Sequence, residues 1–297
     1  MSSTGIELAE TTQPVVRRGK AAALWRRLKK DKFALLGGAI LVIVILSAIL
    51  APVITHYDPY ETKLEQRLLP PGSPGHWLGT DEMGRDLFTR LVYGARVSVM
   101  VGFVAVAIAL FFGILVGLFA GYYGGWVDTI FMRCIDILMA FPYVLLAISI
   151  IAALGPGLLQ AMVAISIVGI PYYARIVRGT VLSLRNKEFV EAEKALGASN
   201  LRIIFKHILP NTMAPIIVAA TLDVGWMIIA AAGLSFLGLG AQPPTAEWGV
   251  MLSEGRKFLR VAPYVSLFPG ICIFLVVLSL NLLGDGLRDA LDPRLKQ

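Results

Sequence analysis

Ionisable residues lie within long apolar stretches of this sequence, where a charge demands an explanation. Asp128, Arg133 and Asp136 stand at the start of one stretch, and Asp223 lies near the middle of another. A charged side chain near the centre of a bilayer costs about 2.5–3.5 kcal/mol on insertion scales, so it normally has a partner or a function. The chemistry open to such carboxylates is proton coupling, contact with a cationic group in transit, or a hydrogen bond between subunits.

Local spacing offers a structural explanation for the first three of these residues. Asp128 begins a predicted helix, where negative charge is favourable, and Arg133 and Asp136 form an i, i+3 pair. We therefore interpret them as packing and topology signals.

Asp223, Trp226 and Met227 are the candidate residues of a translocation path. At about 1.5 Å per residue, Asp223 reaches the middle of the membrane. There it should face the bundle interior or a water-filled path, with a cationic substrate group or a neighbouring subunit as its partner. Ordinary packing in the core or at a subunit interface is the alternative for Trp226 and Met227.

Motifs for catalysis, phosphate binding or metal binding are missing from the sequence. His56, His76 and His207 stand alone, and no HExxH, GxSxG or GxxxxGK[ST] pattern occurs. Cys134 and Cys272 lie far apart, with no CxxC spacing. We expect no enzyme activity, no metal site and no cofactor in this chain, so energy from ATP would have to arrive from a partner.

Composition indicates an integral membrane protein. Of the 297 residues, 57% are hydrophobic and 16% are charged, whereas soluble domains have about 45–50% and about 25%. The formal net charge is +7, but the basic residues flank the apolar runs, as topology signals do. We therefore predict a partner bilayer and no nucleic acid.

Six apolar segments are long enough to cross a hydrocarbon core of about 30 Å as helices. They are Phe33–Val53, Val97–Tyr122, Thr129–Leu154, Leu158–Leu182, Met213–Leu234 and Ala262–Leu283. The first exceeds the apolar region of a signal peptide, which runs about 7–15 residues, so we predict an uncleaved span. Gly113 and Gly117 predict close helix packing in the second segment, and Pro142 and Pro171 predict kinks in the third and fourth.

The distribution of Lys and Arg predicts the topology. These residues concentrate on the side of the N-terminus and of the fourth-to-fifth connection, which indicates that this side and both termini are cytoplasmic. The predicted parts are a basic segment 1–32, a first transmembrane helix 33–56, a periplasmic segment 57–96, a five-helix core 97–284 with a cytoplasmic loop 185–210 and a periplasmic loop 236–261, and a cytoplasmic C-terminus 285–297.

The cytoplasmic loop 185–210 is far longer than a simple connection requires. Lys187–Leu196 is rich in helix formers and stops at Gly197, the usual residue just past a helix C-terminus. Ser199 or Asn200 can cap a second helix with an apolar stripe. Chemistry alone leaves two functions open, an amphipathic helix on the membrane surface and a docking element for a cytoplasmic partner.

Three parts of this loop together resemble the EAA loop of the permease subunits of bacterial ABC importers: Glu191-Ala192-Glu193, Gly197 and His207–Asn211. Glu193 replaces the third Ala of the general pattern, and His207 replaces an Ile, a departure common in the peptide-importer branch. In that family the loop forms the coupling helices, which enter a groove on the ATPase subunits.

The resemblance implies that five residues couple this chain to an ATPase. Glu191 would be a polar contact, Ala192 and Ala195 close-packing positions, Gly197 the obligatory turn, and Ser199 a further member of the set. A short helix clamped between two spans would pass the motion of the docked ATPase to both of them.

Other stretches are similar to the dipeptide/oligopeptide C-type permeases, from about Phe33 to the C-terminus. They are His76–Asp81 with Gly84–Asp86, Arg90, Gly94–Arg96 and Ser98, then Leu237–Thr245 with Glu247–Gly249, and finally Asn281–Pro293.

The whole resemblance implies an all-α membrane protein with six transmembrane helices and the type I ABC importer permease fold, in the bacterial inner membrane. The implied partners are a second, different permease subunit, two ATPase subunits that bind ATP and Mg, and an extracytoplasmic substrate-binding protein that meets 57–96 and Gly238–Arg260. The implied substrates are dipeptides or oligopeptides. The alternatives are nickel or metallophores, glutathione and opines, and the rival from another class is a self-sufficient proton-coupled secondary transporter.

Overall fold

The computed structural model describes residues 28–291, and the regular elements of this part are helices. The long helices are α2 (Lys32–Ile49), α4 (Leu87–Tyr123), α5 (Gly125–Met139), α6 (Tyr143–Leu154), α7 (Leu158–Leu184), α10 (Leu209–Phe236) and α12 (Tyr264–Leu291). The short ones are α3 (Ala51–Ile54), α8 (Glu188–Ala195), α9 (Asn200–Arg202), α11 (Trp248–Gly255), the 3₁₀ turns Leu64–Gln66 and Arg256–Phe258, and the π-helical turn Ile203–Ile208. Most of the predicted basic segment 1–32, and the end of the predicted C-terminus 285–297, lie outside the described residues.

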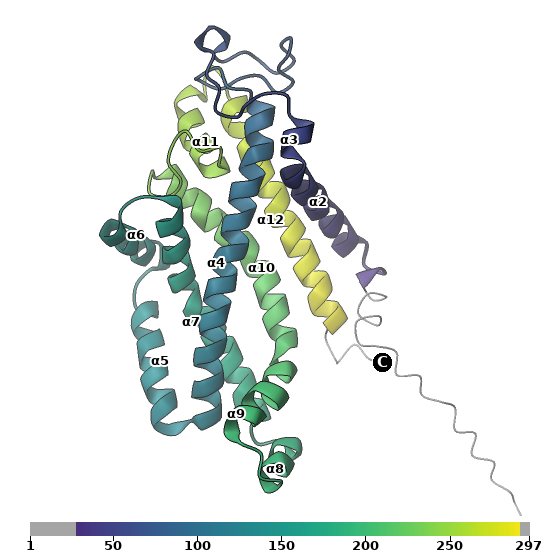
Figure 1. The fold of residues 1–297 in the computed structure, drawn as a ribbon, viewed down its shortest axis with the longest axis vertical. Helices are drawn as coiled ribbons and strands as arrows, with labels where there is room; N and C mark the ends of the chain where they lie inside the picture. Colours follow the sequence, from purple (N-terminus) through teal and green to yellow (C-terminus); the bar gives the residue numbers. More distant parts are fainter. Residues whose placement is uncertain (1–27, 292–297) are drawn as a thin grey trace, which may run out of the picture.

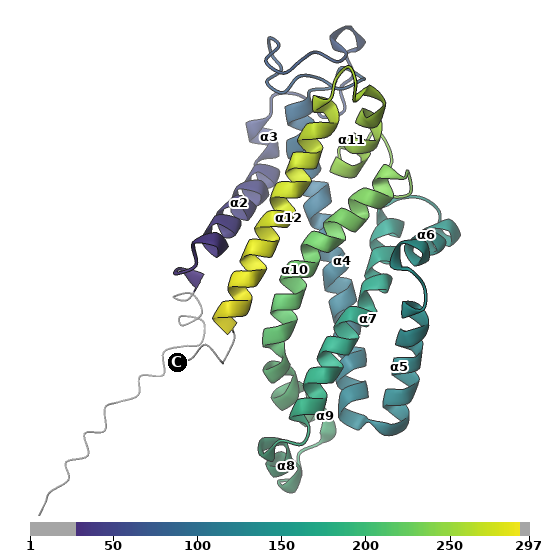
Figure 2. The same ribbon diagram turned by 180° about the vertical axis from the view of Figure 1, so that it is seen from behind.

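The long helices alternate in direction (Figures 1 and 2). Helices α2 and α10 and the α5–α6 pair run toward one end of the molecule, and α4, α7 and α12 run toward the other. Both ends of the described chain lie toward the end that carries α8 and α9. We call residues 185–210 the hairpin, and residues 55–86 together with 237–263, which lie at the opposite end, the cap. Within residues 28–291, five helices could each cross a membrane, or up to six crossings are present if the bent α5–α6 pair is one, which agrees with the six predicted segments.

Helix α4 packs against α7 along a row of glycines. A Cβ atom on Gly113, Gly117 or Gly121 would lie within 2.8 Å of a side-chain carbon of α7. Only glycine permits this approach of the two backbones, so the predicted close packing at Gly113 and Gly117 is confirmed and extends one turn further. The contact makes α4 and α7 the central pair of the bundle.

The third predicted span is not one helix. Helix α5 ends at Met139, α6 begins after Pro142, and the two axes differ by 91°. The predicted kink at Pro142 is thus a complete break, because proline supplies no N–H to continue the ladder and restricts the residue before it. Helix α7, in contrast, continues through Pro171.

The ion pairs of α5 reach across to α7 and are not local. Asp128 receives two hydrogen bonds of 2.6 Å from Arg178, and Asp136 receives one of 2.8 Å from Arg175. The predicted pair between Arg133 and Asp136 is therefore wrong. Asp128 does lie in the first turn of α5, as predicted, where the helix N-terminus favours its charge. The Arg178 guanidinium of α7 stabilises the same carboxylate further.

Two boundaries differ from the prediction as well. Helix α4 begins at Leu87, within the segment predicted as periplasmic, because the Asp86 carboxylate caps it by accepting from the Thr89 N–H. Helix α7 extends to Leu184, two residues beyond the predicted segment, and contains Arg175 and Arg178.

Candidate functional site

The hairpin turns at a glycine with a left-handed backbone. Gly197 follows α8 with φ of 80°, and the N–H groups of Gly197 and Ala198 donate to the carbonyls of Lys194 and Glu193, each at 3.0 Å. These two bonds are the Schellman arrangement that satisfies the last carbonyls of a helix. The predicted turn at Gly197 thus has a direct backbone cause.

An apolar cluster attaches the hairpin to the membrane helices. Val190 of α8 is fully buried against Ile203, Ile204 and Ile208 of the π-helical turn, and the same cluster includes Val177 of α7. Burial of such side chains stabilises contacts by about 1.5–3 kcal/mol each. The hairpin is therefore packed onto α7 and α10 rather than suspended from them.

The opposite face of the hairpin is open to solvent. All five predicted coupling residues are exposed: Glu191, Ala192, Ala195, Gly197 and Ser199. Leu196, with 83% of its surface exposed, and Leu201, with 55%, lie on the same hairpin. These leucines lie among the predicted coupling residues, so a partner that docks on this face would cover them.

The predicted side-chain cap of the second helix is wrong. Ser199 does occupy the N-cap position of α9, but its side chain makes no capping hydrogen bond. The Asn200 amide oxygen instead accepts from the Tyr122 hydroxyl at 2.9 Å, which links the hairpin to the end of α4.

The two residues that depart from the general EAA pattern face one another. The Nε2 atom of His207 lies 3.3 Å from Oε1 of Glu193, so the two arms of the hairpin place these groups side by side without a hydrogen bond between them. Glu193 and His207 are separate departures from the pattern in the sequence, and the fold places them next to each other.

The predicted translocation-path residues line one cavity. Asp223, Trp226 and Met227 contribute to a cavity of about 540 Å³ between α6, α7 and α10. The Tyr173 hydroxyl donates to Asp223 Oδ2 at 2.7 Å, and the centroid of the Tyr143 ring lies 5.3 Å from that of Trp226, with the two planes tilted by 55°. Asp223 therefore has a partner within its own chain, which sequence reasoning did not identify.

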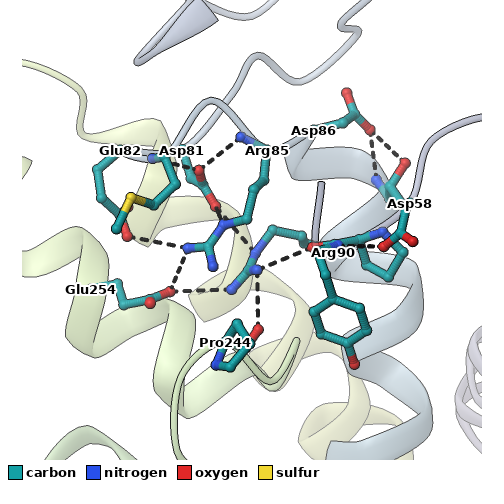
Figure 3. A network of polar contacts seen from close by, with 12 residues as sticks. Asp58, Asp81, Glu82, Arg85, Asp86, Arg90, Pro244 and Glu254 are labelled. Atoms are coloured by element: carbon teal, nitrogen blue, oxygen red, sulfur yellow. Dashed lines mark hydrogen bonds and ion pairs between the residues drawn. The ribbon is translucent and has the colours of Figure 1, made fainter. Parts of the chain in front are cut away.

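A buried charge network holds the cap together (Figure 3). Arg85 and Arg90 both place an Nη2 atom 3.1 Å from Glu254 Oε2 of α11. Asp81 lies 2.6 Å from Arg85 Nε and 3.2 Å from Arg90 Nε. The network thus ties the chain before α4 to the segment between α10 and α12, and most of its charge is compensated within the cap.

Burial shifts the titration of the cap residues. Desolvation, reinforced by the Asp81 charge, raises the pKa of Glu82 above its ordinary value. Burial disfavours the charge of Arg85, but the carboxylates of Asp81 and Glu254 outweigh it and raise the pKa of that guanidinium. Arg85 therefore stays charged, whereas the surroundings of Glu82 disfavour the ionised form of its carboxyl group.

Other motif residues fasten the cap to α4. His76 Nδ1 lies 2.8 Å from Asp86 Oδ1. The Trp248 indole donates to the Leu91 carbonyl at 3.0 Å, over Gly94, where a Cβ would lie 2.9 Å from the Trp248 ring. The binding protein is predicted to meet 57–96 and Gly238–Arg260, and within these stretches the polar groups of His76, Asp86 and Trp248 bond inside the chain. The sequence signal that links the two stretches is that both belong to one family pattern.

Comparison with known proteins agrees with this architecture. The family model described as binding-protein-dependent transport system inner membrane component matches residues 113–297. The model of the N-terminal TM domain of oligopeptide transport permease C matches residues 21–71.

Curated relatives align over nearly the whole chain. The dipeptide transport system permease protein DppC of Alkalihalophilus pseudofirmus is 55% identical over 93% of this chain and 92% of its own. The glutathione transport system permease protein GsiD of Pectobacterium atrosepticum is 45% identical over 96% of both chains.

Solved structures share the fold. A chain of the MetNI methionine ABC transporter in an inward-facing conformation superimposes with a TM-score of 0.56 and 21% identity, over 69% of this chain and 98% of its own. The chain therefore belongs to the family of binding-protein-dependent transport system inner membrane components, and it has the fold of a type I ABC importer permease.

Proposed function

We propose that this chain forms half of the translocation path of an ABC importer for dipeptides and couples that path to ATPase subunits through the hairpin. The observation that carries the proposal is the exposed face of the hairpin, which is anchored on one side by a buried apolar cluster and open on the other. The 55% identity to a dipeptide permease supports the substrate class.

The hairpin has the properties of a transmission element. Val190 and the apolar cluster join α8 to α7 and α10, so a force on the exposed face acts on two membrane helices together. Glu191 offers a carboxylate, and Ala192 and Ala195 leave room for a close neighbour. We infer that two ATPase subunits, which bind ATP and Mg, supply that neighbour, and that this chain is not itself an enzyme.

The proposed assembly has partners on both sides. A second, different permease subunit would cover the open side of the cavity, and an extracytoplasmic binding protein would approach the cap. The positive-inside rule supports a cytoplasmic hairpin and cytoplasmic termini. At the cap end, moreover, Arg85 and Arg90 are neutralised by carboxylates, so they contribute little to the charge difference.

Transport by the reconstituted complex tests this function. The chain would be purified with the second permease, the ATPases and the binding protein, and placed in proteoliposomes. We expect ATP-dependent uptake of a labelled dipeptide in preference to glutathione. The opposite preference would assign the chain to the glutathione importers, which relatives of 45% identity also represent.

The secondary-transporter alternative is tested by the chain alone. Asp136 is engaged by Arg175, and Asp223 by Tyr173, so each candidate coupling carboxylate has an internal partner. Uptake by the isolated chain under a proton gradient, without ATP, would refute the importer.

A further inference from the structure

We propose that Asp223 and Arg175 recognise the two charged termini of a zwitterionic dipeptide as it passes through the membrane, with Asp223 binding the ammonium group and Arg175 the carboxylate. This inference deepens the proposed function and rests on it, because it specifies how the path would select that substrate class.

Two cavities adjoin along helix α7. The first, of about 540 Å³, contains Asp223 in its wall. The second, of about 410 Å³, contains Arg175. Tyr143, Val168 and Tyr172 line both, so the two spaces share one wall. A solute that occupies the shared region lies beside both charged residues.

Each cavity has one charged residue among its described lining residues, and the two charges are opposite in sign. Among the described lining residues, Asp223 is the one charged side chain of the first cavity, and Arg175 is the one charged side chain of the second. All other lining side chains are apolar or aromatic. A molecule with one positive and one negative end therefore matches this pair better than a cation or an anion does.

Both residues retain binding capacity beside their internal partners. Asp223 accepts from Tyr173 through Oδ2, whereas a carboxylate offers about four acceptor sites. Arg175 donates to Asp136 through Nη2 and is 49% exposed, whereas a guanidinium has five N–H donors. Each group therefore keeps hydrogen-bonding positions that its internal partner does not occupy.

Tyr172 connects the two charged residues. It lines both cavities, and Arg175 lies three positions later on the same face of α7. Asp223 is hydrogen-bonded to Tyr173, the residue after Tyr172. A ligand that lies against the Tyr172 ring can therefore extend toward Asp223 in one cavity and toward Arg175 in the other.

The test compares three variants of the complete complex in proteoliposomes. D223N removes the charge and keeps an oxygen to accept from Tyr173, and R175Q removes the second charge. R178Q is the matched control, because Arg178 also joins α5 to α7 through a carboxylate but lines neither cavity. Uptake of labelled alanyl-alanine and ATP hydrolysis are measured together, with the binding protein saturated by substrate.

We expect D223N and R175Q each to reduce uptake at least tenfold, with ATP hydrolysis within twofold of wild type, and R178Q to transport within twofold of wild type. N-acetylated alanyl-alanine has no ammonium group, so the D223N loss should disappear for it, while the R175Q loss should remain. Normal dipeptide uptake by D223N and R175Q would overturn the inference alone, as would an equal loss in R178Q. Absence of dipeptide uptake by the wild-type complex would overturn both the proposed substrate class and this inference.

Discussion

Replacement of Gly197 by valine isolates the contribution of one backbone angle to coupling. Gly197 has φ of 80°, and an added Cβ would meet no atom within 4 Å. The Cβ atom itself is therefore not crowded by distant parts of the chain, and the main penalty comes from the left-handed conformation. That penalty is about 1–2 kcal/mol for an ordinary L-residue, and a β-branched residue is a marked outlier there.

The consequence is a change in the population of the native turn. If φ leaves the left-handed region, the hydrogen bonds to the Lys194 and Glu193 carbonyls break and α8 loses its C-terminal anchor. A penalty of 1–2 kcal/mol corresponds to a factor of about 5–30 in that equilibrium. We expect G197V to lower ATP-driven uptake by about tenfold and to weaken the attachment of the ATPases.

The matched control is G197N. Asparagine has a side chain about as large as that of valine, but it tolerates the left-handed region. Uptake by G197N should therefore stay within about threefold of wild type. The assay measures uptake per assembled complex, together with the ATPase retained on affinity purification. Wild-type uptake by G197V would refute the reasoning, and so would an equal loss in G197N, which would indicate side-chain size as the cause.

The remaining predictions concern packing and the cap. Replacing Gly117 with leucine should separate α4 from α7 and lower the yield of folded, monodisperse protein several-fold in detergent, whereas alanine at the exposed Gly179, where a Cβ meets no atom, should not. E254A removes one of the two carboxylates that Arg85 and Arg90 share and leaves Asp81 as the other, so it should cost about 1.5–3 kcal/mol, measured as a lower thermal unfolding temperature; an unchanged temperature would show that Glu254 does not stabilise the network. E82Q should raise the thermal unfolding temperature by an amount that depends on pH. Because the pKa of Glu82 is raised in the folded protein, the wild type loses stability as the pH rises from the ordinary glutamate value through the raised one. E82Q should therefore unfold at a higher temperature than wild type at pH 8 but not at pH 4, and a constant difference would contradict this cause.

Features that depend on local sequence were predictable. Apolar length indicated six crossings, Gly197 indicated the turn of the hairpin, and Gly113 with Gly117 indicated a close helix contact, because each signal resides in residues a few positions apart.

Features that depend on distant partners were not predictable in this way. Asp136 has a near neighbour of opposite charge at i–3, and yet its partner is Arg175, 39 positions away. Asp223 was recognised as unusual, but its Tyr173 donor lies 50 positions away. Local spacing describes one helix surface, and pairing across helices is decided by how the bundle packs.

The length of α4 has a consequence for communication across the bilayer. Its 37 residues extend about 55 Å, well beyond a hydrocarbon thickness of about 30 Å. One end is fastened into the cap through Asp86 and Trp248, and the other meets the hairpin through Tyr122. Helix α4 is thus one continuous helix that extends from the cap to the hairpin. A tilt of α4 at one membrane surface therefore moves its other end directly, without intervening helices.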